Sequence, residues 1–94
     1  MVKEVNFLDG YIEFIEENKG LFRLKEKAYK IDLESIDKVE RLTENNKLIG
    51  FILWERNKVL YAIGFKNYDK DLDILYDKVL NSIKRSINIT ETEL

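Results

Sequence analysis

The side chains that most often carry out chemistry in proteins are missing from this chain. It has no histidine and no cysteine, which removes the commonest general bases, thiol nucleophiles and transition-metal ligands. Ser35, Ser82 and Ser86 therefore have no histidine that could activate a hydroxyl group. We expect a protein that is not an enzyme and that has no catalytic residue, no metal site and no cofactor.

Three acids alternate along the chain in a pattern that resembles the start of a calcium-binding loop, at Asp69, Asp71 and Asp73. Such a loop needs a glycine after its third acid and a bidentate glutamate near its end. Ile74 and Leu80 occupy those two positions. The pattern instead predicts acids that cap the beginning of a helix, where carboxylates interact favourably with the helix dipole.

Basic side chains gather around one predicted turn, with Phe22 and Tyr29 interleaved: Arg23, Lys25, Lys27 and Lys30. This pattern is a candidate site for anionic lipid headgroups or for nucleic-acid phosphates. The other interpretation is a charged hairpin tip that keeps a sheet edge soluble. The chain as a whole has 16 basic and 18 acidic residues, a net charge of −2 and a pI near 5.2. This balance argues against nucleic acid as a partner and leaves a membrane surface as a minor candidate.

The chain is short and carries no targeting signal that we recognise. Its 94 residues correspond to a single domain, residues 1–94. The first residues, Met-Val-Lys-Glu, do not form a signal peptide. The longest unbroken apolar run, Leu48–Trp54, is far shorter than the roughly 20 residues of a membrane-spanning helix. We expect a cytoplasmic protein without a transmembrane segment.

The first half of the chain predicts short strands separated by polar turns. Alternation and turn residues predict the strands Val2–Leu8, Leu21–Lys25 and Ala28–Leu33, with turns at Asp9-Gly10 and Glu26-Lys27. Residues 11–17 fit either a strand or a helix, and their β-branched and aromatic residues favour the strand. Residues 34–42 fit either a helical turn or a bent strand, because their apolar positions recur every third residue.

The most hydrophobic part of the chain, Leu48–Phe65, predicts a β-hairpin. With Arg56-Asn57 at the centre of its turn, Glu55 faces Lys58 as an opposite-charge pair. Continued without interruption, this register places large residues opposite small ones, for example Gly50 opposite Ile63.

The same register puts four large side chains on one face of this hairpin: Ile52, Trp54, Tyr61 and Ile63. Because the hairpin is apolar on both faces, this face belongs either to the core or to an interface with a partner. Trp54 and Tyr61 are the expected contact residues if the face is exposed, since aromatic side chains dominate interface energetics.

After the hairpin, an apolar stripe with helical spacing predicts an amphipathic helix over residues 68–87, followed by a frayed tail at residues 88–94. The stripe consists of Leu72, Leu75, Tyr76, Val79, Leu80, Ile83 and Ile87. The expected fold class is therefore α+β. An antiparallel meander of about six to seven strands forms a partly open barrel or a strongly curved sheet, and one C-terminal helix packs on it.

The order of these elements resembles a bacterial pleckstrin-homology-like or GRAM-like domain over residues 10–87. Gly10-Tyr11-Ile12-Glu13-Phe14 followed by Leu21-Phe22-Arg23-Leu24 resembles the opening hairpin of that family. Ile31-Asp32-Leu33-Glu34-Ser35-Ile36-Asp37-Lys38-Val39 resembles the pattern that follows it. The resemblance implies a partly open barrel with the helix closing one end, used as a binding or assembly module.

Together these observations predict a small non-catalytic binding or assembly module. Its main expected partner is another protein, or a second copy of itself, held through the 48–65 hairpin. An alternative is binding of anionic lipid headgroups or nucleic-acid phosphates through the basic turn at residues 23–30. A third possibility is a small regulator or inhibitor of a host enzyme.

Overall fold

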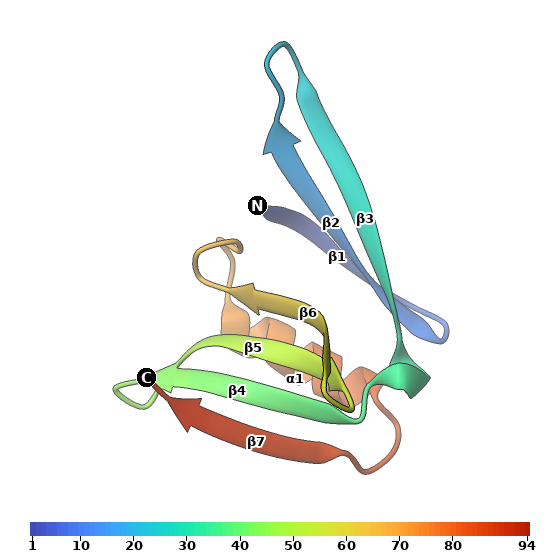
Figure 1. Cartoon of the computed structure of the whole chain (residues 1–94), viewed down its shortest axis with the longest axis vertical. Helices are drawn as coiled ribbons and strands as arrows, with labels where there is room; N and C mark the ends of the chain where they lie inside the picture. The colour runs from blue at the N-terminus through green and yellow to red at the C-terminus, as the bar shows by residue number, and fades with distance from the viewer.

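A computed structural model describes residues 1–94, and its strands divide into two sheets (Figure 1). The first sheet has three antiparallel strands in chain order: β1 (Val2–Leu8), β2 (Tyr11–Lys19) and β3 (Leu24–Asp32). Gly10 adopts a φ of +83° in the turn between β1 and β2, a conformation that glycine adopts without steric cost. Residues 11–17, which the sequence left open, belong to a strand.

Strand β3 is longer than the sequence predicted. One continuous strand, Leu24–Asp32, runs through Glu26-Lys27, so the prediction of a turn there is wrong, and residues 21–23 of the first expected strand lie in the turn instead. Glu16 of β2 lies opposite Lys27, an opposite-charge pair across the ladder. The polar residues Glu26 and Lys27, which predicted a turn, are therefore held in the strand by pairing with β2.

Residues 34–42 combine the two alternatives that the sequence left open. Leu33–Ser35 form a short 3-10 turn, η1, and the Asp32 side chain accepts a hydrogen bond from the Glu34 backbone N–H at 3.0 Å. The chain then enters strand β4 (Lys38–Glu44), and a tight turn leads into β5 (Lys47–Glu55). In that turn Asn45 and Asn46 have positive φ angles of 52° and 64°, which suits asparagine in hairpins.

The second sheet has four strands in the order β6-β5-β4-β7, where β6 spans Lys58–Gly64 and β7 spans Asn88–Glu93. Strand β7 pairs with β4 in parallel from Lys38↔Asn88 to Thr43↔Glu93. The expected frayed tail is therefore wrong: residues 88–93 form an edge strand. Its six residues are all exposed, so the sequence has no buried face there that would predict a strand.

The single α-helix, α1, spans Leu72–Ser82 and is shorter than the predicted 68–87. It begins where expected for a capped helix, because the Asp71 side chain accepts a hydrogen bond from the Ile74 N–H at 3.1 Å. Beyond its end, the Arg85 guanidinium donates hydrogen bonds to the backbone carbonyls of Leu33, Glu34 and Ile36. Arg85 thus ties the segment after the helix to η1.

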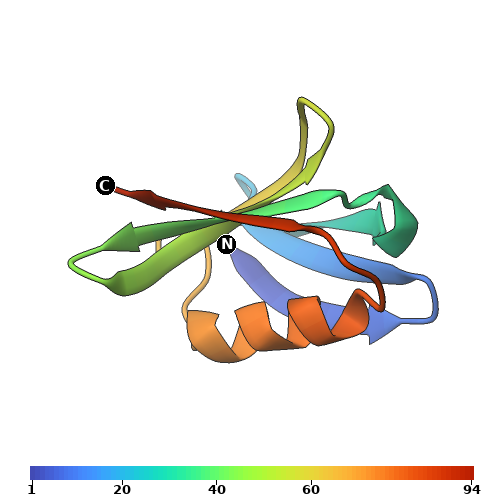
Figure 2. The ribbon, with the colours of Figure 1, turned by 90° about the horizontal axis from the view of Figure 1, so that it is seen from below.

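The helix and the three-stranded sheet lie on the same side of the four-stranded sheet, as the view from below shows (Figure 2). Sixteen buried apolar residues form one core between these layers. The predicted fold class is confirmed: seven strands form curved sheets that are not closed into a barrel, and one helix packs on them.

Candidate functional site

The β5–β6 hairpin contains a β-bulge that the sequence did not predict. The predicted pairs Glu55↔Lys58 and Trp54↔Val59 are present, but the register then shifts by one residue. Beyond the bulge Tyr61 lies opposite Leu53. An extra residue on one strand turns all later side chains of that strand to the other face.

The bulge separates the four residues that the sequence placed on one face. Tyr61 and Ile63 are buried in the core, with exposed fractions of 8% and 3%. Ile52 and Trp54 lie on the opposite side of the sheet, which carries neither the helix nor the other sheet. The prediction of one shared face is therefore wrong: Tyr61 and Ile63 belong to the core, and Ile52 and Trp54 lie on the uncovered side of the sheet.

Tyr61 joins the two sheets. Its ring stacks on Phe14 of β2 with centroids 4.1 Å apart, and its hydroxyl donates a 2.5 Å hydrogen bond to the Glu16 carboxylate. Burial, together with this hydrogen bond, raises the pKa of the Tyr61 hydroxyl far above its ordinary value. Tyr61 is therefore a structural residue and not a contact residue.

We call the uncovered side of the four-stranded sheet the outer face. The strand register gathers apolar side chains on its β4, β5 and β6 strands: Leu42, Ile52, Trp54, Val59 and Ala62. None of them belongs to the core or packs against it, and Val59 and Ala62 are exposed. The viewer of Figure 1 looks onto this face, with α1 behind the sheet.

Trp54 is held in place on the outer face by polar neighbours. Its indole N–H donates a 3.1 Å hydrogen bond to Glu40. The other oxygen of Glu40 accepts a 2.6 Å hydrogen bond from the Thr92 hydroxyl of β7. The Lys38 ammonium lies 4.7 Å from the Trp54 ring centroid, a favourable cation–π distance. Sequence reasoning found Trp54 but missed Thr92, because β7 was not predicted. It also missed Lys38 and Glu40 of β4, because residues 34–42 were left open between a helical turn and a strand.

The basic residues predicted around the second turn are also divided. Arg23, Lys25 and Lys27 are exposed on the projecting β2–β3 hairpin. Lys30 lies near the base of that hairpin, opposite Glu13, with its ammonium 5.3 Å from the Tyr11 ring. The structure therefore brings three of the four predicted anion-binding residues into one region.

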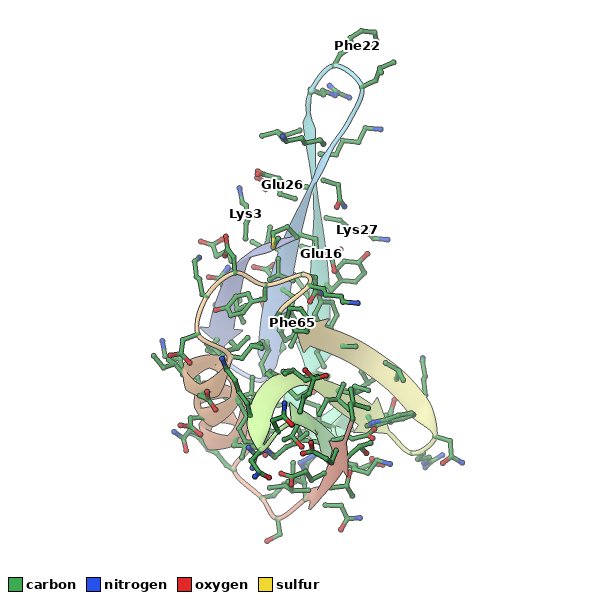
Figure 3. The ribbon with its side chains drawn as sticks, turned by 90° about the vertical axis from the view of Figure 1, so that its left-hand side faces the viewer. Lys3, Glu16, Phe22, Glu26, Lys27 and Phe65 are labelled. Carbon is green, nitrogen blue, oxygen red and sulfur yellow. The ribbon has the colours of Figure 1, made fainter.

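The end of the β2–β3 hairpin carries apolar residues whose exposure the sequence did not indicate. Leu21 and Phe22 are 89% and 93% exposed, and Phe22 lies at the far end of the molecule (Figure 3). They had been assigned to a strand, where at least one would have had a buried face. Gly20 was the available signal for a turn at this point. The two large apolar residues and Arg23 that follow it are unusual in a turn, and they favoured a strand instead.

Nothing in the structure gathers three or more histidine, cysteine, aspartate or glutamate side chains in a metal-binding arrangement. No helix is long and apolar enough to span a bilayer. No family model, curated protein or solved structure matches the chain. The resemblance to pleckstrin-homology-like domains stays a prediction.

Proposed function

We propose that this protein is a non-catalytic binding module that contacts another protein through its outer face. The absence of histidine and cysteine from the sequence supports a non-catalytic role. The half-buried apolar residues of β5 and the exposed ones of β6 support the choice of surface, because contiguous apolar patches on a protein surface mark interaction sites.

The observation that carries the proposal is the fixed position of Trp54. Glu40 holds its indole N–H and Lys38 lies against its ring. A side chain ordered before binding loses less conformational entropy when a partner covers it. Tryptophan is also among the residues that contribute most to interface energies. Trp54 therefore has both the chemistry and the rigidity of a binding hot spot.

The polar groups beside Trp54 are compatible with burial of the outer face by a partner protein. An unpaired charge would be costly to bury, but the Glu40 carboxylate already accepts hydrogen bonds from Trp54 and Thr92. Lys38 and the threonines of β7 form a polar rim beside the apolar centre. An apolar centre with a polar rim is the usual anatomy of a protein interface.

The size of the outer face favours a transient partner over a permanent dimer. Four strands spaced by about 4.8 Å and paired over roughly six residues each form a face of roughly 400 Å². Covering this area on both partners removes roughly 800 Å² from solvent, which is below the range of stable obligate interfaces. We therefore expect a separate protein as the partner, such as an enzyme that the module regulates.

A pull-down from the native cytosol tests this function. We expect wild-type protein to retain a partner that Trp54→Ala loses. Ile74→Ala is the matched control, because Ile74 is 56% exposed on α1 and lies outside the outer face. Equal retention by all three proteins would contradict the proposal, and so would self-association as the only Trp54-dependent contact.

A further inference from the structure

The β2–β3 hairpin projects beyond the rest of the molecule, and we call its end, residues 19–25, the tip. Figure 1 shows the hairpin extending away from both the helix and the four-stranded sheet, and Figure 3 places Phe22 at its extreme end. Leu21, Phe22 and Leu24 are 89%, 93% and 55% exposed. The tip therefore presents three large apolar side chains that neither belong to the core nor pack against it.

The tip is also positively charged. Lys19, Arg23 and Lys25 lie within it, and it contains no acid. None of these three cations forms an ion pair, because the salt bridges of the protein are Lys3–Glu17, Lys3–Glu26 and Arg41–Glu91. A basic apolar tip on a protein with a net charge of −2 is complementary to a surface that is anionic outside and apolar inside.

The acids nearest the tip are already engaged. Lys3 of β1 pairs with both Glu17 and Glu26, which face each other two pairs before the last strand pair, Lys19↔Leu24, and Figure 3 shows Lys3 and Glu26 on the same side. Glu16 accepts the hydrogen bond of Tyr61. These contacts partly neutralise the carboxylates that would otherwise repel an anionic surface.

The cations surround the apolar residues on both faces of the hairpin. Lys19 lies opposite Leu24 on one face, and Asn18 lies opposite Lys25 on the other. Arg23 lies in the turn between the two strands. A convex apolar end ringed by cations fits a deformable surface that can close around it better than it fits a rigid groove on a protein.

We propose that the tip binds anionic lipid bilayers by shallow insertion. Leu21 and Phe22 enter the boundary between headgroups and acyl chains, and the three cations lie among the lipid phosphates. This contact depends on the density of negative charge and requires no headgroup-specific pocket. Insertion along the hairpin axis leaves the outer face uncovered, since the two surfaces point in different directions (Figure 1).

Co-sedimentation with phosphatidylcholine vesicles, with and without phosphatidylglycerol, tests the proposal. We expect binding only to the anionic vesicles, weakened by salt because surface charges are screened. Each juxtamembrane cation strengthens such binding by about fivefold, so Arg23→Gln with Lys25→Gln weakens it by about 25-fold. Leu21→Ser with Phe22→Ser weakens it by at least about tenfold. Ile74→Ser, an exposed apolar residue on the helix, leaves binding unchanged.

Fluorescence detects the insertion itself. In a Trp54→Phe protein, Phe22→Trp places the sole tryptophan at the tip, and we expect its emission to shift to shorter wavelength on anionic vesicles. The tip residues are exposed, so each tip substitution should keep the thermal midpoint of the protein into which it is introduced, wild type or Trp54→Phe. The proposal is overturned by absence of binding at low salt, by equal binding to neutral vesicles, or by binding that ignores the tip substitutions. Cross-linking of the tip to a protein without vesicle binding would equally overturn it.

Discussion

Gly50 and Gly64 lie directly opposite each other in the β5–β6 ladder, and the two backbones approach closely at this point. A Cβ atom at Gly50 would lie 2.8 Å from the Ile63 carbonyl oxygen and 3.2 Å from the Gly64 Cα. The contacting atoms belong to the backbone, so they cannot move aside as a flexible side chain would. The pairing of two glycines thus allows the hairpin to adopt its bulged register.

Gly50→Ala should therefore destabilise the protein by about 1–3 kcal/mol, the usual cost of forcing extra volume into a packed site. Urea unfolding measures this free energy. Gly10→Ala is the comparison, because no atom lies within 4 Å of its Cβ position and only its φ of +83° is unfavourable. We expect Gly10→Ala to cost about 1 kcal/mol. A Gly50→Ala protein as stable as wild type would show that the backbones do not meet as described.

The bulge also shows what the sequence could and could not predict in this hairpin. The turn at Arg56-Asn57 and the adjacent pairs followed from charge and position. The register beyond Val59 did not, because a hairpin that is apolar on both faces gives no penalty for exchanging them. The sequence therefore identified Trp54 and Tyr61 as notable aromatics but could not tell that one is a surface residue and the other a core residue.

Elements with clear periodicity were predicted well, and elements that depend on distant partners were not. The apolar stripe from Leu72 to Ile83 identified the helix, and alternation identified strand β1. Strand β7 has no apolar face, and its pairing with β4 joins residues about fifty positions apart, as in Lys38↔Asn88. Nothing local to residues 88–93 encodes that pairing, so the hydrogen bond from Thr92 to Glu40 beside Trp54 was out of reach as well.

The hydrogen bond from Tyr61 to Glu16 predicts a measurable coupling between the two sheets. Tyr61→Phe keeps the ring stacked on Phe14 but leaves the half-buried carboxylate without its donor. We expect a loss of about 1–3 kcal/mol in the free energy of unfolding. Tyr61→Leu also removes the aromatic stacking and should lose a further 0.5–1.5 kcal/mol, roughly. Equal stability of the two variants in urea would contradict a role for the stacked rings.

Glu93 makes the attachment of β7 dependent on pH. Its carboxylate accepts hydrogen bonds from the Thr43 hydroxyl at 2.7 Å and from the Asn45 N–H at 2.8 Å. The Thr43 bond and then the Asn45 bond lower the pKa of Glu93 below its ordinary 4.5. A lowered folded-state pKa means that this stabilisation is complete above pH 4.5 and is lost as the pH falls through the folded value.

Thermal midpoints of wild type and Glu93→Gln measure this effect. The neutral amide can still accept a hydrogen bond but loses the charge. We expect wild type to be the more stable at neutral pH and the difference to shrink on acidification to about pH 3. A difference that stays constant over this range would show that the Glu93 charge does not contribute.

Arg85 predicts a requirement for the length of an arginine side chain. One of its nitrogens, Nη2, donates to three backbone carbonyls of the segment from Leu33 to Ile36, and the shorter lysine side chain does not bring its ammonium to that point. Arg85→Lys should cost about 1–2 kcal/mol of unfolding free energy. Lys84→Arg, next in sequence and exposed, should change stability by less than about 0.5 kcal/mol. Similar values for both substitutions would contradict the assigned contacts.

Site-specific photo-cross-linking in the producing cells tests whether the outer face around Trp54 binds another protein. A photoreactive amino acid replaces Val59, which lies opposite Trp54 and is 46% exposed, or Ile74, which is 56% exposed on α1. We predict a protein cross-link at position 59 that Trp54→Ala abolishes and that is absent at position 74. Equal cross-linking at both positions, or a cross-link at position 59 that Trp54→Ala leaves intact, would contradict it.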